Sequence, residues 1–336
     1  MEITEYNTRK ISEITMSYNN KIATERQIHA RNSINIRRNF LLSQYQRQTQ
    51  LLALDNQLRN TITSLQQKMN NELDKLNSIG PKTILSSFKG IKKALLIGIN
   101  YENTPSQLNG CINDVSLIGN HIKSKGFSVT LLTDKTENKP TKNNIITELE
   151  NFLSSSLEND VLYFHYSGHG SNVVDINNDE LDRKDETIVS KDLQNITDDE
   201  LVSIIRKKLP KNRTLIAVFD SCHSGTVLDL KYNVEYVENS QTLRISDSAK
   251  YTDIDPNIIM ISGCRDSQFS EECLTSTGVN GLLTWGLYET ITKNKNLTFK
   301  SIYVSLLKLL KGIGAIQVPQ LSMGSLIDIN EPINIF

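Results

Sequence analysis

The sequence predicts an α/β protein, with a mostly parallel sheet covered by helices on both faces and an α-helical region before it. From about residue 92 onward, short apolar runs alternate with amphipathic segments, which is typical of parallel sheets with crossover helices. The first 79 residues contain no glycine and no proline, so they lack the residues that commonly punctuate helices.

We expect three parts: a helical leader at residues 1–80, a linker at 81–91 and an α/β domain at 92–336. In the leader, two sets of apolar residues recur every seven positions, which favours a coiled coil or a helical hairpin. A long amphipathic helix packed on its own domain is the alternative. The two sets are Leu51, Leu58 and Leu65, and Ile62, Met69 and Leu76.

The leader also has an uneven charge distribution. Residues 26–54 contain five arginines and no acidic residue. This stretch could contact a membrane surface or nucleic acid, but a solvated basic face is the simpler explanation.

The spacing of apolar residues predicts the strands and helices of the α/β domain. The strands are short apolar runs, and the helices repeat apolar residues every three or four positions. Strands are expected at 93–99, 127–132, 160–166, 214–219, 257–262 and 317–322, and helices at 111–125, 141–156, 198–208, 280–293 and 298–311. Residues 229–256 read as a polar stretch with little periodicity.

Composition excludes several classes of protein. The formal net charge is −1, so no strong overall field selects a nucleic acid, and we expect no nucleic-acid partner. No apolar run is long enough to span a bilayer, and the N-terminus lacks a signal-peptide pattern. Four cysteines in 336 residues are not a disulfide framework. We therefore expect an intracellular protein, located in the cytoplasm.

Two strand ends carry reactive residues 53 positions apart. Residues 163–170 read YFHYSGHG, and residues 218–225 read VFDSCHSG. The carboxyl ends of parallel strands meet at one edge of the sheet, where a histidine can activate a thiol. We therefore expect His169 and Cys222 to form a catalytic dyad. Taken singly, His169 could be a loop residue and Cys222 a small buried apolar residue.

These motifs resemble those of the caspase-like cysteine peptidases and, among them, the type I metacaspases. Other stretches agree with the resemblance: LNGCIND at 108–114, VLDLKY at 227–232, ISGCRD at 261–266, LTW at 283–285 and QVPQLS at 317–322. The resemblance covers about residues 92–336, and not the leader. It implies a caspase-like fold with a large segment at 92–230, a processing loop at 231–256 and a small segment at 257–336.

The resemblance also implies roles for individual residues. Cys222 would be the nucleophile and His169 the general base and then acid, with the backbone N–H groups of Gly170 and Cys222 holding the oxyanion. The first specificity pocket would be lined by Cys111, Asp114, Ser167 and Asp220. Two carboxylates in a small pocket favour a cationic side chain, which predicts cleavage after Arg or Lys. Helix capping by Asp220 and a solvated helix start at Asp114 are the alternatives.

Calcium activation is a further implication. The positions that match the family's ligands are Asp185, Asp198, Asp199 and Asp229. The family usually has glycine where Arg183 stands, and a positive charge there would weaken binding. Capping at a helix start also explains Asp198 and Asp199. An EF-hand-like spacing at 175–186 has Glu180 where the loop glycine belongs, so we do not favour it.

The family resemblance further implies a zymogen that processes itself, with candidate cleavage sites at Lys231, Arg244 and Lys250. The leader would recruit a partner, oligomerise the enzyme or cover its site. The alternative function is a catalytically silent caspase-like scaffold assembled through that leader. A cysteine phosphatase would need arginine where Leu228 stands, and Cys264 is interpreted as a core residue.

Overall fold

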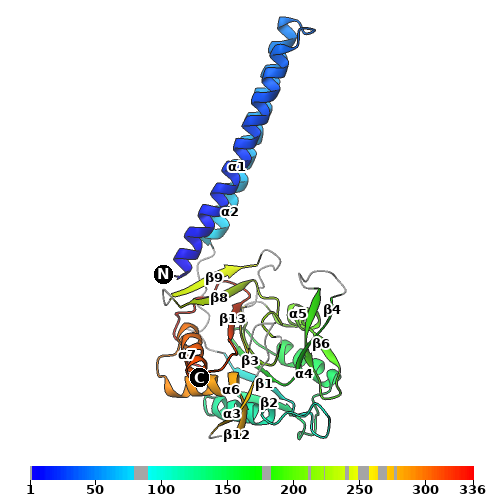
Figure 1. Ribbon diagram of the computed structural model, residues 1–336, viewed down its shortest axis with the longest axis vertical. Coiled ribbons are helices and arrows are strands. Elements are labelled where there is room, and N and C mark those ends of the chain that lie inside the picture. The colour runs from blue at the N-terminus through cyan, green and yellow to red at the C-terminus, as the bar shows by residue number, and fades with distance from the viewer. Residues whose placement is uncertain are drawn as a thin grey trace. The chain divides into compact units, whose positions relative to one another are not determined.

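The computed structural model describes residues 2–78, 90–175, 183–210, 213–222, 224–238, 242–248, 257–263, 271–275 and 278–336. The chain divides into two compact units, Met1–Pro81 and Lys82–Phe336. The first unit is helical, and the second holds the strands (Figure 1). None of the described helices is both long enough and apolar enough to cross a membrane.

Two long helices, α1 (Glu2–Arg38) and α2 (Gln44–Ser78), pack along each other as an antiparallel hairpin (Figure 1). The Tyr18 hydroxyl donates to Glu72 at 2.6 Å, and His29 Nε2 lies 2.7 Å from a carboxylate oxygen of Asp55. The predicted helical leader is confirmed, with its two helices paired as a hairpin. A coiled coil in the strict sense stays a prediction.

The chain reverses between the two helices without glycine or proline. The backbone N–H of Leu41 donates to the Asn39 side chain at 3.1 Å, which closes a local turn. Ser43 and Gln46 then form a reciprocal capping box: Gln46 N–H donates to Ser43 Oγ at 3.2 Å, and Ser43 N–H donates to Gln46 Oε1 at 2.9 Å. Side-chain hydrogen bonds therefore do what glycine and proline do elsewhere.

The second unit is built on an eight-stranded sheet, which confirms the predicted mostly parallel architecture. Its order is β2-β1-β3-β7-β10-β13-β8-β9, with the first five strands parallel and the last three antiparallel. In chain order the strands are β1 (Lys92–Gly98), β2 (Ser128–Thr133), β3 (Val161–Ser167), β7 (Thr214–Asp220), β8 (Tyr232–Val237), β9 (Thr242–Asp247), β10 (Asn257–Ser262) and β13 (Gln320–Met323).

Helices cover both faces of this sheet (Figure 1). On one face lie α3 (Cys111–Ser124) and α6 (Leu282–Lys293), with α7 (Phe299–Gly312) packed on α6. On the other lie α4 (Lys142–Ser154) and α5 (Asp198–Lys208). Alternate residues of the central strands pack against α4 and α5 to form the main apolar core.

Two small sheets were not predicted. One contains β4 (Gly170–Val174), β5 (Lys184–Val189) and β6 (Asn195–Thr197), and the other contains β11 (Glu272–Thr275) and β12 (Gly278–Gly281). β4 begins directly after the predicted catalytic histidine, and β12 ends where α6 begins. Both sheets therefore lie in segments that lead to or from the predicted site.

The expectation of an aperiodic stretch at 229–256 is wrong. β8 and β9 form a hairpin there, and this hairpin extends the main sheet beyond β13. Tyr232, Val234, Leu243 and Ile245 are buried, because alternate residues of both strands face the protein interior. This period-two pattern is the signal that the sequence reading missed.

Candidate active site

The register between β3 and β7 brings the predicted dyad together. The two strands are parallel, and Ser167 lies opposite Asp220 at their carboxyl ends. His169 and Cys222 each follow two residues later, so both leave the sheet at the same point. A Cβ atom added to Gly170 would overlap the carbonyl oxygen of Cys222, so these two loops touch and only glycine fits.

Both residues open into one pocket of about 360 Å³. All the residues expected for the dyad, the oxyanion donors and the specificity pocket contribute to its lining. The lining comprises Leu108, Cys111, Asp114, Ser167, Gly168, His169, Gly170, Asp220, Cys222, Glu271, Glu272 and Gly281. His169 is the only basic residue in this set, so the pocket is acidic. Cys222 is half-buried and is not in a disulfide.

The His169 ring is held by groups that the sequence reading missed. The ring packs against that of Tyr101 in a tilted arrangement, with ring centroids 4.7 Å apart, and the backbone N–H of His169 donates to the Tyr101 hydroxyl at 2.9 Å. Its Nε2 lies 2.7 Å from the carbonyl oxygen of Ser106. Since a carbonyl only accepts, Nε2 carries the proton, and Nδ1 of the neutral ring keeps the basic lone pair. Tyr101 follows the end of β1, so the strand-end rule could have drawn attention to it.

Of the four acidic residues in this lining, Asp114 and Asp220 are buried, and each accepts hydrogen bonds from neighbouring groups. Asp114 accepts from Ser167 Oγ at 2.7 Å, from Asn280 Nδ2 at 3.1 Å and from the Gly281 N–H at 3.0 Å. Asp220 Oδ2 accepts from the Thr284 N–H at 2.9 Å and from Thr284 Oγ1 at 2.8 Å.

The close approach of the two acids depends on glycine at position 281. A Cβ atom there would overlap the Asp220 carboxylate and would lie 3.0 Å from Asp114 Oδ2. Any side chain at this position would therefore displace one of the acids. Sequence reasoning did not single out Gly281.

The unfavourable electrostatics of this arrangement change the pKa of Asp114. Burial, and then the neighbouring Asp220 carboxylate, raise the pKa of Asp114 well above its usual range. Burial, and then Asp114, likewise raise the pKa of the Cys111 thiol, which therefore stays neutral. A positively charged group entering the pocket would favour the ionised form of both acids.

A buried histidine lies behind Asp220 and supports it. His165 is fully buried, and burial lowers its pKa to about 3, so the ring is neutral. His165 Nδ1 lies 3.1 Å from the Tyr163 hydroxyl, and its Nε2 lies 3.0 Å from Thr284 Oγ1. Because Thr284 Oγ1 donates its proton to Asp220, it accepts from His165 Nε2. A chain of hydrogen bonds thus runs from the Tyr163 hydroxyl through His165 and Thr284 to the Asp220 carboxylate.

The candidate calcium residues differ in their surroundings. Asp185, Asp198 and Asp229 are buried, whereas Asp199 is exposed and lines a shallow depression with Arg206 and Lys207. Burial raises the pKa of Asp198 to about 7, and the Asp229 and Asp185 carboxylates add to the shift. Three buried carboxylates that repel one another match the oxygen donors that Ca²⁺ prefers. Within the described ranges, no three such side chains are already placed to hold a metal ion.

Arg183 has φ = 62°, in the left-handed region that favours glycine. Glycine would adopt this conformation without strain. An arginine here strains the backbone and puts a charge two residues from Asp185. The N–H of Asp175 donates to the Arg183 carbonyl at 3.0 Å, which fixes the turn.

The two described candidate cleavage sites lie in or next to the β8–β9 hairpin and not in an open loop. Arg244 lies within β9 and pairs with Glu235 on β8. Lys231 precedes β8, and its carbonyl accepts from the Ser248 N–H at 2.8 Å. Lys250, like Cys264, lies outside the described residues.

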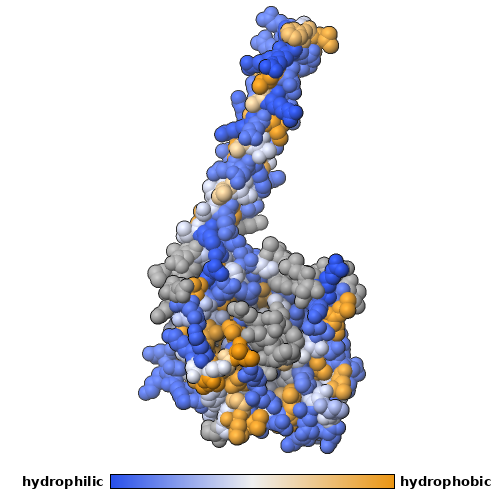
Figure 2. Space-filling view, viewed as in Figure 1, coloured by the Kyte–Doolittle hydropathy of each residue, from blue (hydrophilic) through white to orange (hydrophobic). Residues whose placement is uncertain are grey.

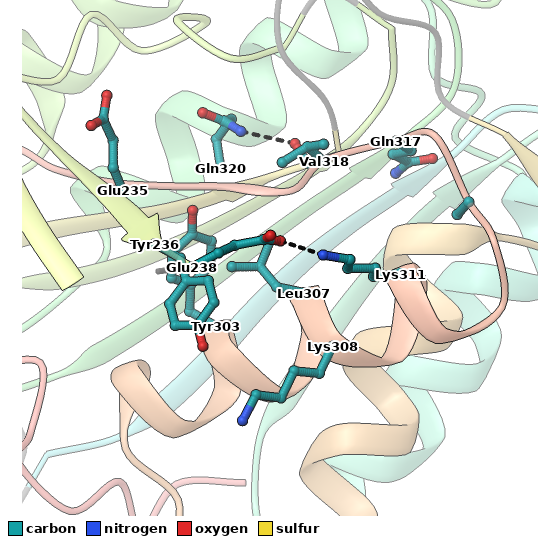
Figure 3. A pocket seen from close by; sticks show the side chains of 11 residues that line it. Glu235, Tyr236, Glu238, Tyr303, Leu307, Lys308, Lys311, Gln317, Val318 and Gln320 are labelled. Atoms are coloured by element: carbon teal, nitrogen blue, oxygen red, sulfur yellow. Dashed lines mark hydrogen bonds and ion pairs between the residues drawn. The ribbon is translucent and has the colours of Figure 1, made fainter. Parts of the chain in front are cut away.

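A larger hollow of about 640 Å³ lies elsewhere, between β8, α7 and residues 315–320 (Figure 3). Glu238 and Lys311 form a 2.6 Å ion pair in it (Figure 3). Its lining contains no cysteine and no histidine, so it offers neither a thiol nucleophile nor an imidazole base. The smaller pocket is therefore the candidate active site.

Comparisons with known proteins agree with this geometry. A family model described as "Metacaspase, peptidase C14 domain" matches residues 92–231. Metacaspase-1 of Schizosaccharomyces pombe is 33% identical over 306 residues, covering 73% of this chain and 70% of that protein. Metacaspase-2 of Trypanosoma brucei brucei is 32% identical over 262 residues, covering 71% of this chain and 75% of that protein.

Solved structures confirm the expected caspase-like fold. Caspase-1 of Spodoptera frugiperda superposes with a TM-score of 0.51 at 11% identity, over 76% of this chain and 95% of that one, which shows the fold alone. A protein from Geobacter sulfurreducens gives a TM-score of 0.52 at 25% identity, over 69% of this chain and 93% of that one.

The raised pKa of Asp114 predicts how pH affects stability. An acid with a higher pKa in the folded state stabilises the fold below its unfolded pKa, and this contribution is lost as the pH rises towards the folded pKa. Asp114→Asn removes the titration. We therefore expect the free energy of unfolding of this variant, relative to the wild type, to rise by about 1 kcal/mol or more between about pH 5 and pH 8.

Urea unfolding at the two pH values measures this difference. Glu158→Gln, which neutralises an exposed carboxylate, is the control and should show no such trend. Parallel pH profiles for Asp114→Asn and the wild type would contradict the assignment of a raised pKa to Asp114.

Proposed function

This chain belongs to the metacaspase family of caspase-like cysteine peptidases, and from that premise we propose that it cleaves peptide bonds after arginine or lysine. The observation that carries the proposal is the pair of buried carboxylates, Asp114 and Asp220, in the pocket that also contains Cys222. A cationic substrate side chain would be attracted to these carboxylates, whereas an acidic one would be repelled by them.

The proposed chemistry uses the dyad at the two strand ends. His169 Nδ1 takes the proton of the Cys222 thiol, and the sulfur attacks the carbonyl carbon of the substrate. The backbone N–H groups of Gly170 and Cys222 donate to the oxyanion of the tetrahedral intermediate. His169 then gives its proton to the leaving amine, and water hydrolyses the thioester. The Ser106 carbonyl keeps the ring oriented and is placed to stabilise the imidazolium.

Specificity follows from how the acids are held. The donors on Asp114 and Asp220 fix both carboxylates before a substrate arrives, so little ordering is needed on binding. A guanidinium can bridge both carboxylates, whereas an ammonium acts as a point charge. We therefore expect arginine to be preferred over lysine.

We also propose that Ca²⁺ activates the enzyme. Asp185, Asp198 and Asp229 would hold the ion with Asp199, whose side chain would have to turn inward from the surface. When bound, the ion would supply positive charge that offsets the repulsion among these carboxylates. Residues 184–189 also form β5, which pairs with the strand that begins at Gly170, so order here supports the dyad loop.

Self-processing is the third part of the proposal. Cleavage at Lys231 or Arg244 has to compete with the hydrogen bonds of the β8–β9 hairpin. A protease binds its substrate as an extended, unpaired segment, so the hairpin would open first. Processing at either residue should therefore be slow compared with cleavage of short peptides.

Replacement of the dyad tests the enzyme against the silent scaffold. Cys222→Ala should lower kcat/KM for arginine-ended fluorogenic peptides by about a thousandfold or more, because the nucleophile is gone. The same variant should stay a single chain on a denaturing gel after incubation with Ca²⁺. Cys273→Ala, at another half-buried free thiol, is the matched control and should retain activity.

If the wild type hydrolyses neither arginine-ended nor lysine-ended peptides at any calcium concentration, the scaffold is the better description. Equal hydrolysis of aspartate-ended peptides would contradict the acidic-pocket argument while leaving the dyad intact.

The support behind Asp220 can be tested at Thr284. Thr284→Val removes one donor to the carboxylate and leaves His165 Nε2 without its acceptor. A hydrogen bond to a charged group contributes about 1.5–3 kcal/mol, so we expect KM for arginine peptides to rise by about tenfold or more, with a smaller change in kcat. Thr284→Ser keeps the hydroxyl and should restore KM. An unchanged KM in the valine variant would mean that Asp220 does not need this donor.

Calcium activation predicts opposite effects of two substitutions. Asp198→Asn removes a buried carboxylate and should raise the calcium concentration for half-maximal activity by about tenfold or more. Arg183→Gly removes a positive charge and relieves left-handed backbone strain, so it should lower that concentration and also raise Tm. Titrations of peptidase activity with CaCl₂ measure both effects, and Glu158→Gln is the control. Full activity of the wild type in excess chelator would refute the proposal.

A further inference from the structure

The connection between α1 and α2 exposes large apolar side chains. We define the hairpin tip as residues 37–47. Phe40 is 92% exposed, Leu41 95% and Tyr45 79%. Figure 2 shows hydrophobic side chains gathered at this end of the hairpin, next to strongly hydrophilic ones. Exposed apolar surface of this kind is unfavourable in water and commonly marks a contact site.

The exposure is built into the turn. The Asn39 side chain binds the Leu41 N–H, and the Ser43–Gln46 capping box starts the next helix. Backbone bonds from Asn39 to Ile36 and from Leu42 to Asn39 add to the turn. Phe40 and Leu41 are therefore held outward by a hydrogen-bonded loop.

Positive charge surrounds the apolar side chains. Arg37 and Arg38 end α1, and Arg47 lies in the first turn of α2. All three belong to the stretch 26–54, which has no acidic residue. No salt bridge to another described residue neutralises any of the three. Arg31 lies about 10 Å farther along α1 than Arg38, at the helical rise per residue, so it is close to one Debye length away.

We propose that the hairpin tip docks on the surface of a lipid bilayer that contains anionic phospholipids. Phe40 and Leu41 enter the boundary between headgroups and acyl chains, and Tyr45 lies at the level of the headgroups. The three arginines contact lipid phosphates and carboxylates. This inference does not depend on the proposed peptidase activity.

The shape and charge of the tip favour a bilayer over other occupants. Phe40 and Leu41 belong to the turn that joins α1 and α2 at the end of the hairpin (Figure 1), where both side chains are almost fully exposed. Arginines come from both helices, so they surround the turn and do not mark one face. The surface of an anionic bilayer can accept this turn in any rotation about the hairpin axis. Bases could stack on Phe40 and Tyr45 but not on Leu41, whereas a bilayer accepts all three side chains.

Vesicle sedimentation with the full chain tests the proposal. The wild type should sediment with vesicles containing about one third phosphatidylserine and bind neutral phosphatidylcholine vesicles about a hundredfold more weakly, since each of the three arginines contributes about fivefold near an anionic surface. The double substitution Phe40→Ser, Leu41→Ser should weaken binding by about tenfold or more. Arg37→Gln with Arg38→Gln should weaken binding to the anionic vesicles by about twenty-five-fold, on the same factor for two residues.

Two matched variants control for general effects on the hairpin. Met16→Ser with Leu52→Ser changes two apolar residues, 66% and 62% exposed, outside the tip. Arg59→Gln with Lys68→Gln removes the same charge from exposed positions farther along α2. Both should bind like the wild type, and circular dichroism should show equal helicity for all four variants.

The remaining outcomes overturn the proposal. Failure of the wild type to sediment with either vesicle, or equal loss in the control pairs, removes the lipid contact. If the tip substitutions convert a dimer to a monomer in the absence of lipid, by light scattering, a second copy covers the tip. If nucleic acid displaces the protein from anionic vesicles while Phe40→Ser with Leu41→Ser leaves vesicle binding unchanged, the charge alone acts and the apolar residues do not.

Discussion

The site depends on the pairing register of β3 with β7. Ser167 lies opposite Asp220, and this single alignment sets the chain positions of everything that follows. A shift of one residue in this register would displace the loop that carries His169 relative to the loop that carries Cys222. It would also turn the side chains of the shifted strand to the opposite face of the sheet. The register is held by burial on both sides of the central strands, whose residues pack under helices above and below. The contact of Gly170 with the Cys222 carbonyl leaves no room for an alternative.

Burial stabilises the register of the central strands, whereas the acidic pocket destabilises the fold. Two carboxylates are buried beside each other, and the pKa of Asp114 records the unfavourable energy. Donors from Ser167, Asn280, Gly281 and Thr284 recover part of that cost without supplying a positive charge. A positive charge that entered the pocket would lower this cost further, because it would favour the ionised form of both acids.

The two units of the chain rely on different physics. The sheet unit buries nearly every residue of its central strands. The hairpin buries few of its apolar residues, among them Tyr6, Tyr18, Ile22 and Leu76. Its length exposes polar and charged side chains to solvent and carries the apolar turn at 39–43 to its end. The hairpin is therefore suited to contacting another surface through its apolar turn, whereas the sheet unit is suited to holding reactive side chains in fixed positions.

The sequence alone predicted the sheet class, most strands and helices of the α/β domain, and the placement of His169 and Cys222 at two strand ends, whereas the pocket residues were inferred from the family resemblance. It could do so because burial on both faces leaves continuous apolar runs, and reactive residues follow the strand ends directly. Only the tertiary structure brought in Ser106, Thr284 and Gly281, which act through a carbonyl, a hydroxyl and a missing side chain. None of these has a local signature, because each depends on which segments distant in sequence pack against the site. The β8–β9 hairpin was missed for a related reason. Its strands bury one face only, so apolar residues alternate with polar ones and give a weaker signal than a continuous apolar run. The alternation can be recognised as a strand once β13 is known to pair with β8.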